Sequence, residues 1–266
     1  METLEQSLIG RLLAGAVAVA ALLTAGVGGV APAAAGTPTA RVVPLACHGS
    51  LAGQTLNRPI VGITAAPDNG GYWLVASDGG VFSFGDAQFY GSTGNIRLNQ
   101  PIVGMAATPD GGGYWLVASD GGVFSYGDAQ FYGSTGNIRL NQPVVAMGTT
   151  HDGKGYWLVA ADAGVFSYGD ARYLGGGPVS QDGVAANNFS AFAAATDGSG
   201  YLIASSNRAF LLNFGSAQYF GLGYSAADTS PLAGISAPNA AAGYGYWEAT
   251  QAGSVYALGA SGQSTC

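Results

Sequence analysis

The sequence predicts an all-β fold, a five-bladed β-propeller with blades of about 42–45 residues. Three observations predict it. The stretch GYWLVASDGGVFS occurs at 71–83 and again at 113–125, a Gly-Tyr pair recurs along the chain, and residues 47–59 resemble the end of a repeat. A segment that recurs at such a period is usually one structural unit, which buries its apolar face only against its neighbours.

The Gly-Tyr pair sets the period. It begins at Gly71, Gly113, Gly155, Gly200 and Gly245, so successive copies are 42, 42, 45 and 45 residues apart. The third copy reads GYWLVAADAGVFS, and the fourth and fifth copies have diverged further. We therefore expect five units, of which three are nearly alike.

Each repeat has the pattern of short β-strands joined by tight turns. In the first repeat we expect strands in PIVGITAAP (59–67), GYWLVASD (71–78) and VFSFGD (81–86), and a short fourth strand in QFYGS (88–92). No window shows the i, i+3, i+4 apolar spacing of a helix. Four short strands in about 42 residues match the size of a propeller blade.

The two ends of the chain predict that the ring of blades closes. Residues 47–59 align without a gap on 89–101, whereas the fifth repeat runs out where its copy of QFYGS should follow. We expect the N-terminal strand to complete the C-terminal blade. The two cysteines, Cys47 and Cys266, lie at these two ends, and in an exported protein such a pair predicts a disulfide. The alternative is two free thiols.

Residues 1–35 are typical of a signal peptide. An apolar run, 12–30, follows Arg11, and the small residues APAAAG come next. The alternative is an uncleaved N-terminal anchor, because the run is nearly long enough to span a bilayer, and Glu2 and Glu5 are unusual before it. We expect residues 36–46 to be a linker, 47–266 to be the propeller, and the location to be extracellular or the cell envelope.

The motif PIVGMAATPDGGGYWLVASDGGVFSYGDAQFYGS resembles a repeat found in many exported actinobacterial proteins. There it stands alone or beside peptidoglycan-hydrolase or esterase modules. The resemblance is strong over 59–175 and weak over 189–260. In blade number and length the chain is also similar to five-bladed lectin propellers of the tachylectin type, although no ligand residues match. The WD dipeptide of WD40 blades is absent from the sequence.

The composition excludes some functions and gives no sign of catalysis. The net charge is −7, and the few cations are scattered, which excludes a nucleic-acid-binding surface. No G-x-S-x-G motif occurs, and we interpret His48 and His151 as structural. Glu248 occupies a strand position that is Leu74 in the first repeat, so it either lies at an exposed edge or faces a solvent-filled pocket. We therefore expect no enzyme and no cofactor.

The aspartates recur in three sets, each with glycine within two residues. Asp favours such turns because its carboxylate accepts backbone N–H groups two residues further on, which predicts a structural role. A ligand site in each blade is the alternative. Structural calcium is a weaker one, because no D-x-D-x-D-G loop occurs. The sets are Asp68, Asp110, Asp152 and Asp197; Asp78, Asp120 and Asp162; and Asp86, Asp128 and Asp170.

The repeated aromatic and polar residues supply the candidate ligand site. The tryptophans are either core between the blades or the walls of a groove in which sugar rings stack. The segment QFYGSTGNIRLNQ adds tyrosine, asparagine and arginine in two copies. The candidate residues are Trp73, Trp115, Trp157, Tyr90, Tyr132, Asn95, Asn137, Arg97 and Arg139.

The function that we expect is a non-catalytic secreted binding module for a glycan or a cell-wall polymer. Similar blades would present similar weak sites, and multivalency would raise the avidity. An extracellular protein-interaction or envelope scaffold is the alternative, and a hydrolase is less expected. We expect neither nucleic acid nor metal as a partner, and a membrane only if the N-terminal segment stays uncleaved.

Overall fold

In the computed structural model the described residues all belong to the unit formed by residues 46–266. The described residues are 48–51, 53–68, 70–177, 180–181, 184–185, 188–195, 197–207, 211–217, 230–236, 245–250, 255–259 and 262–265. The predicted signal peptide and linker lie outside them, as do Cys47 and Cys266, which would form the disulfide. Within these residues every regular element is a strand, and no helix is long and apolar enough to cross a bilayer.

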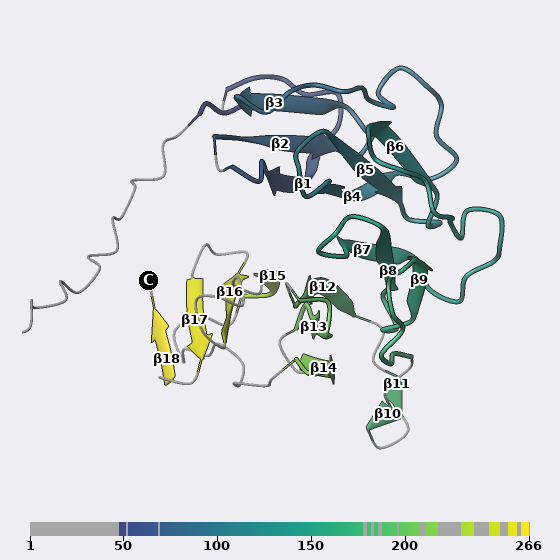
Figure 1. Ribbon diagram of the computed structural model, residues 1–266, viewed down its shortest axis with the longest axis vertical. Coiled ribbons are helices and arrows are strands. Elements are labelled where there is room, and N and C mark those ends of the chain that lie inside the picture. The colour runs from purple at the N-terminus through teal and green to yellow at the C-terminus, as the bar shows by residue number, and fades with distance from the viewer. Residues whose placement is uncertain are drawn as a thin grey trace, which may run out of the picture. The chain divides into compact units, whose positions relative to one another are not determined.

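Each of the first three repeats forms one three-stranded antiparallel sheet, with its strands in chain order (Figure 1). This confirms the first three strands that the sequence predicts in each repeat. The sheets comprise β1 (Ile60–Ala65), β2 (Gly71–Ala76) and β3 (Val81–Gly85); β4 (Ile102–Ala107), β5 (Gly113–Ala118) and β6 (Val123–Gly127); and β7 (Val144–Thr149), β8 (Gly155–Ala160) and β9 (Val165–Gly169).

The last two repeats also form sheets. The fourth has three strands, and the last has four, because β18 pairs with β17. A short β10–β11 pair precedes the fourth sheet. The strands are β10 (Ser180–Gln181) and β11 (Val184–Ala185); β12 (Phe189–Ala194), β13 (Gly200–Ser205) and β14 (Leu211–Gly215); and β15 (Leu232–Ser236), β16 (Gly245–Thr250), β17 (Val255–Gly259) and β18 (Gly262–Thr265).

The turn between the second and third strands of a sheet explains the Asp-Gly-Gly sequence. In the first sheet the carboxylate of Asp78 accepts the N–H of Gly80 at 3.0 Å. Gly79 has a φ of +78°, a left-handed conformation that a residue without Cβ adopts at little cost. The structural role predicted for this set of aspartates is confirmed in the described turns.

Backbone hydrogen bonds join neighbouring sheets in chain order. They link the first strand of one sheet to the turn after the middle strand of the preceding sheet. In each case the residue that begins the first strand of one sheet donates its N–H. The acceptor is the carbonyl of the residue that directly follows the middle strand of the preceding sheet. Such bonds satisfy edge groups and fix the order of the sheets. The bonds are Ile102 to Ser77 (2.9 Å), Val144 to Ser119 (2.8 Å), Phe189 to Ala161 (3.1 Å) and Leu232 to Ser206 (2.7 Å).

The expected fourth strand of the first repeat is wrong, because residues 88–92 form no strand. This segment, which follows the third strand and which we call the tail of the repeat, leaves the β-ladder and lies between two sheets instead. The indole Nε1 of Trp73 donates to the carbonyl of Gln88 at 2.8 Å, and the next sheet supplies Tyr114, whose hydroxyl donates to the carbonyl of Gly91 at 2.6 Å. Side-chain hydrogen bonds thus replace the β-ladder.

The N-terminal residues take the place of such a tail on the first sheet. The hydroxyl of Tyr72 donates to the carbonyl of Gly49, as that of Tyr114 does to Gly91, and the ring of His48 lies 6.4 Å from the ring of Tyr72. His48 and Gly49 therefore contact the first sheet as their aligned residues, Tyr90 and Gly91, contact the second. The expected N-terminal strand does not form among residues 48–51, and the last sheet takes its fourth strand, β18, from the C-terminus.

The core lies between neighbouring sheets. Each tryptophan of the first three sheets packs against the Gly-Tyr tyrosine of the next, with ring centroids 5.7 Å apart for Trp73 and Tyr114 and 5.8 Å apart for Trp115 and Tyr156. Trp157 and Tyr201 repeat the contact at 5.8 Å. These side chains are at most 1% exposed, so the repeated dipeptide builds the interface between sheets.

Candidate functional site

The three tryptophans of the candidate site are core residues. Trp73, Trp115 and Trp157 are 0–1% exposed, and each indole Nε1 donates to the backbone of its own tail at 2.8–2.9 Å. A sugar needs an open ring face on which to stack, and none of these rings has one. The structure thus corrects the assignment of these rings to a sugar groove and confirms the core interpretation.

Tyr90 and Tyr132 are half-buried and join neighbouring repeats. The hydroxyl of Tyr90 donates to the carbonyl of Gly111 at 2.7 Å, and that of Tyr132 donates to Gly153 at 3.0 Å. Each ring also lies 5.7 Å from the Gly-Tyr tyrosine of the next sheet. These two candidates therefore position the tail and leave little of the ring open to a ligand.

The asparagines and arginines of the candidate site are available to solvent. Asn95, Arg97, Asn137 and Arg139 are all exposed. Ion pairing among the described residues occurs between Lys154 and Asp152, so these arginine side chains are not neutralised within that part of the chain. These four residues fit a ligand-binding role better than the aromatics that were grouped with them.

A polar groove of about 350 Å³ lies beside this loop. It runs between the Asn-x-Pro segments that precede the first two sheets. Carboxylate, guanidinium and amide groups lie beside two aliphatic side chains, so the groove offers both hydrogen-bond donors and acceptors. Its lining comprises Arg58, Ser77, Asp78, Ile96, Leu98, Asn99, Gln100 and Pro101.

A second kind of hollow, which we call the turn pocket, lies between neighbouring sheets and occurs twice among the described residues. One copy, of about 200 Å³, brings together Asp68, Asp86 and Asp110. The other, of about 300 Å³, brings together the equivalent Asp152, Asp170 and Asp197, with His151 and Arg172. Members of two of the three predicted aspartate sets thus meet in each pocket. The following repeat supplies one of the three aspartates, Asp110 or Asp197.

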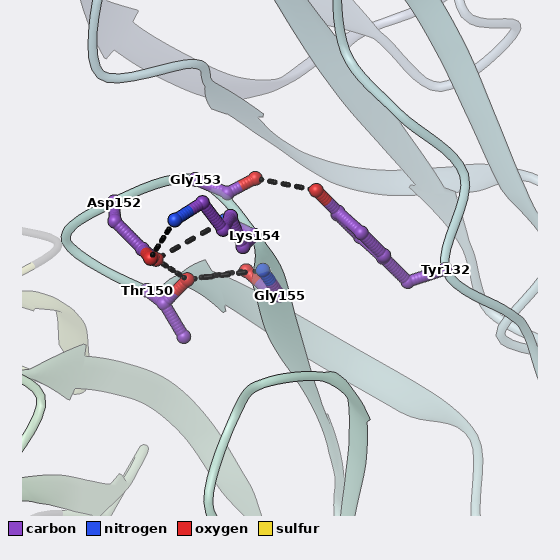
Figure 2. A network of polar contacts seen from close by, with 6 residues as sticks. All are labelled: Tyr132, Thr150, Asp152, Gly153, Lys154 and Gly155. Carbon is purple, nitrogen blue, oxygen red and sulfur yellow. Dashed lines mark hydrogen bonds and ion pairs between the residues drawn. The ribbon is translucent and has the colours of Figure 1, made fainter.

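The turn beside the second pocket is a small hydrogen-bonded network (Figure 2). The Oδ1 atom of Asp152 accepts the backbone N–H of Lys154 at 3.2 Å and the hydroxyl of Thr150 at 3.0 Å. Thr150 Oγ1 also accepts the N–H of Gly155 at 3.0 Å, and Lys154 Nζ lies 3.2 Å from Asp152 Oδ2. The network ties the turn to the start of β8.

Hydrogen bonds within the turns lower the pKa of Asp110, Asp152 and Asp197 and so favour their ionised forms. The backbone N–H of Lys154 is the largest cause that lowers the pKa of Asp152, to about 2. The backbone N–H of Gly112 lowers the pKa of Asp110, and the side chain and backbone of Ser199 lower that of Asp197. The pockets therefore carry negative charge at neutral pH, although the same carboxylates also hold the turns together.

The described residues do not assemble a metal centre. No three His, Cys, Asp or Glu side chains among them are placed to hold an ion. His48 packs on the first sheet, and His151 lies at the surface of a turn. Glu248 is fully buried in β16, opposite Ile235 and Tyr256, so its placement at an exposed edge is wrong.

Sequence reasoning missed the exposed rings of the tail segments. Phe89, Phe131 and Tyr173 are 54%, 55% and 57% exposed and occupy the same position in three successive repeats. The signal was present in the sequence, because the fourth repeat also has an aromatic residue, Tyr219, at this position. This signal is hard to recognise because a tyrosine, Tyr90 or Tyr132, directly follows the exposed ring in the first two repeats.

The fold has a counterpart among solved structures. The β-propeller domain of Cps50 (Swd1) from Myceliophteria thermophila matches with a TM-score of 0.50 at 10% sequence identity, over 78% of this chain and 72% of that one. The likeness shows a β-propeller fold. No family model matches the chain, and no curated protein matches it.

Proposed function

We propose that the chain is an exported, non-catalytic β-propeller module that binds a glycan or cell-wall polymer through sites repeated on its blades. One observation carries the proposal. The same exposed side chains, in the tail and in the following loop, recur on successive sheets, whereas the residues that join the sheets are buried. Exposed residues contribute little to the core, so their recurrence supports a role in binding.

The repetition itself favours a polymer over a folded protein as the ligand. A polymer presents one chemical unit many times, and sites repeated along the sheets can engage several units at once. Linked weak sites of this kind raise the avidity by about 10²–10⁴ over a single site. A folded protein partner would present a surface that does not repeat, and it would make no use of near-identical blades.

The polar groups present suit a ligand that is rich in hydroxyl groups. Ionised carboxylates in the turn pockets accept hydrogen bonds from hydroxyls, and the amides of Asn99 and Gln100 in the loop groove donate and accept them. Arg97 adds an exposed donor between the groove residues Ile96 and Leu98, and Arg139 is the exposed equivalent in the loop of the second repeat. A neutral or mixed-charge polysaccharide fits this set better than a polyanion, given the carboxylates.

We also propose that the sheets are five blades of a closed ring. Ile63 is 67% exposed, whereas its equivalent in the second repeat, Met105, is 8% exposed because the preceding sheet covers it. Closure on the last sheet would bury Ile63 in the same way, and a Cys47–Cys266 disulfide would hold the seam. Peptide mapping without reductant should recover these two cysteines in one linked fragment. Two free thiols in the exported protein would contradict this disulfide.

The binding proposal is tested with protein produced from the full-length sequence and insoluble peptidoglycan, chitin and cellulose as probes. We expect saturable binding to at least one polymer, competed by soluble fragments of that polymer. The stoichiometry with a short fragment should exceed one site per chain. Absence of binding to all three polymers would overturn the proposal.

A protein-interaction scaffold is the second candidate. The observation that favours it is a pair of exposed aliphatic side chains, Ile96 and Ile138, each 54% exposed in the loop after the tail. Aliphatic groups at a surface gain from burial against a partner protein but stack poorly on sugars. If the wild type bound none of the three polymers, this candidate would replace the polymer-binding proposal.

A further inference from the structure

We infer that the exposed rings of Phe89, Phe131 and Tyr173 are stacking platforms, each of which takes one sugar ring of the polymer. The inference rests on the proposed function and deepens it, because it names the residues that hold the ligand. These rings replace the buried tryptophans as the aromatic part of the site.

The first argument is exposure. Most described aromatic side chains of the first three repeats are buried or half-buried between sheets, and these three are the aromatic exceptions among the large exposed apolar residues. Burying an aromatic ring on folding is strongly favourable, so an aromatic left in water contributes little to stability. Three such rings at equivalent positions form a repeated surface feature and differ from singly scattered apolar residues.

The second argument comes from drift between the repeats. The fourth repeat has lost the tryptophan of the core, where it has Leu202, yet in sequence it keeps an aromatic residue, Tyr219, at the position equivalent to Phe89. The neighbouring half-buried position changes from Tyr90 to Leu174 in the third repeat. An aromatic side chain thus occurs at this position in the first four repeats, including one that has lost the core tryptophan and one that has lost the adjacent tyrosine.

The third argument is rigidity. The backbone on both sides of Phe89 is held by side chains of two different sheets. Trp73 Nε1 donates to the carbonyl of Gln88 at 2.8 Å, and the hydroxyl of Tyr114 accepts the N–H of Tyr90 at 3.2 Å. The same two bonds hold the segment around Phe131 in the second tail. A ring on a pre-positioned backbone loses little further entropy when a ligand stacks on it.

The chemistry of the surroundings favours a sugar over another apolar ligand. Each ring follows an exposed polar residue, namely Gln88, Gln130 or Arg172. The C–H face of a pyranose can lie on the ring while amide or guanidinium groups bond its hydroxyls. An apolar ligand would leave these polar groups without partners.

The test compares three sets of variants in binding to insoluble peptidoglycan, chitin and cellulose. Phe89→Ala/Phe131→Ala/Tyr173→Ala removes the platforms, and Val61→Ala removes an exposed aliphatic group that lies outside the tails, the polar groove and the turn pockets, as a control. Phe89→Tyr/Phe131→Tyr keeps the rings. We expect the platform variant to keep the wild-type unfolding midpoint and to lose binding on the order of 100-fold, because several linked sites fail together. The other two variants should bind within a few-fold of the wild type.

The outcomes separate this inference from the proposed function. If the wild type binds a polymer and the folded platform variant binds it equally well, the platforms are wrong and the binding function stands. If the aliphatic control loses as much binding as the platform variant, stacking is not the mechanism. If the wild type binds none of the polymers, both the function and the platforms are overturned.

Discussion

The backbone carbonyl of Ala163 accepts the N–H of Gly177 at 2.8 Å, joining the Asp-Ala-Gly turn of the third sheet to its tail. In the second repeat the equivalent pair is Gly121 and Thr135, bonded at 3.1 Å. A Cβ atom on Gly121 would lie only 1.7 Å from Thr135 Oγ1. The third repeat therefore has alanine in the turn where its tail has glycine, and the two exchanges compensate each other.

This relationship predicts that Gly121→Ala is destabilising and that a second substitution relieves it. The new methyl group would meet Thr135 and would also sit at a φ of +76°, so we expect a loss of about 2–4 kcal/mol of unfolding free energy. In a double-mutant cycle with Thr135→Gly, the double variant should be more stable than the sum of the single variants by about 1–3 kcal/mol. Urea unfolding measures all four proteins.

Gly198→Ala is the matched control for that cycle. Its φ is +69°, but no atom lies within 4 Å of the Cβ position, so the substitution costs only the left-handed backbone conformation, about 1–2 kcal/mol. A loss at Gly121 equal to that at Gly198, with no coupling to Thr135, would show that the contact with the tail is unimportant.

Tyr114→Phe should loosen the tail of the first repeat from the second sheet. The hydroxyl donates to the carbonyl of Gly91 at 2.6 Å and accepts the N–H groups of Tyr90 and Gly91 at 3.2 and 3.1 Å. Its removal leaves three backbone groups short of partners, which costs about 1–3 kcal/mol. Hydrogen exchange should speed up at Tyr90 and Gly91 without a general change elsewhere.

Tyr72→Phe is the comparison for the tyrosine variant. Its hydroxyl makes the equivalent bond to Gly49, but at a more exposed site where water can replace it. We expect a smaller loss of stability than for Tyr114→Phe. Equal losses at both sites would mean that the terminal segment is held as firmly as an internal tail.

The sequence was sufficient for the strands and turns because their causes are local. Asp-Gly-Gly dictates the turn at Gly79, and the alternation in GYWLVA dictates a middle strand. The tail was mispredicted as a strand because its partners are side chains of two sheets. Trp73 lies opposite Ser83, on the same face of the sheet, and its indole reaches the carbonyl of Gln88, a bond that no local pattern reveals.

The candidate site was only partly predictable for the same reason. Adjacent aromatics such as Phe89 and Tyr90 look equivalent in sequence, yet one is exposed and the other donates to Gly111 in the next repeat. Which ring is left in water depends on the path of the tail between the sheets. By contrast, Asn95 and Arg97 follow the tail in a loop, and their exposure agrees with their polar character.

Trp115→Ala should act on stability and not directly on binding. The side chain is fully buried against Tyr156, and its Nε1 donates to the carbonyl of Gln130 at 2.8 Å. We expect a loss of about 3–5 kcal/mol, as for other large aromatic truncations in a core. Phe131→Ala, at an exposed position, should change stability by less than about 0.5 kcal/mol. Thermal unfolding followed by tryptophan fluorescence distinguishes the two.

Trp115→Phe completes this prediction. It keeps most of the ring volume and loses the hydrogen bond, so the protein should fold with reduced stability and bind a polymer ligand as the wild type does. A folded Trp115→Phe protein that no longer binds would place the indole in the ligand site.

Acid should destabilise the protein through its turn aspartates, and Asp152 gives the clearest case. Its folded-state pKa of about 2 lies below the usual 3.8, so the ionised form is the one that the folded turn favours. A depressed pKa contributes stability that is fully present above about pH 4 and is lost as the pH falls through about 2. Asp152→Asn keeps an oxygen that accepts the N–H of Lys154 but does not titrate. Its unfolding midpoint should therefore differ little from the wild type at pH 7 and should fall less steeply between pH 4 and pH 2.

Because the backbone N–H of Lys154 is the largest cause of the shift in the pKa of Asp152, the difference between the two proteins should persist in 0.5 M salt, which screens the exposed ion pair with Lys154 Nζ. Parallel acid limbs for the two proteins, or a difference that salt removes, would assign the effect to the ion pair or to other carboxylates.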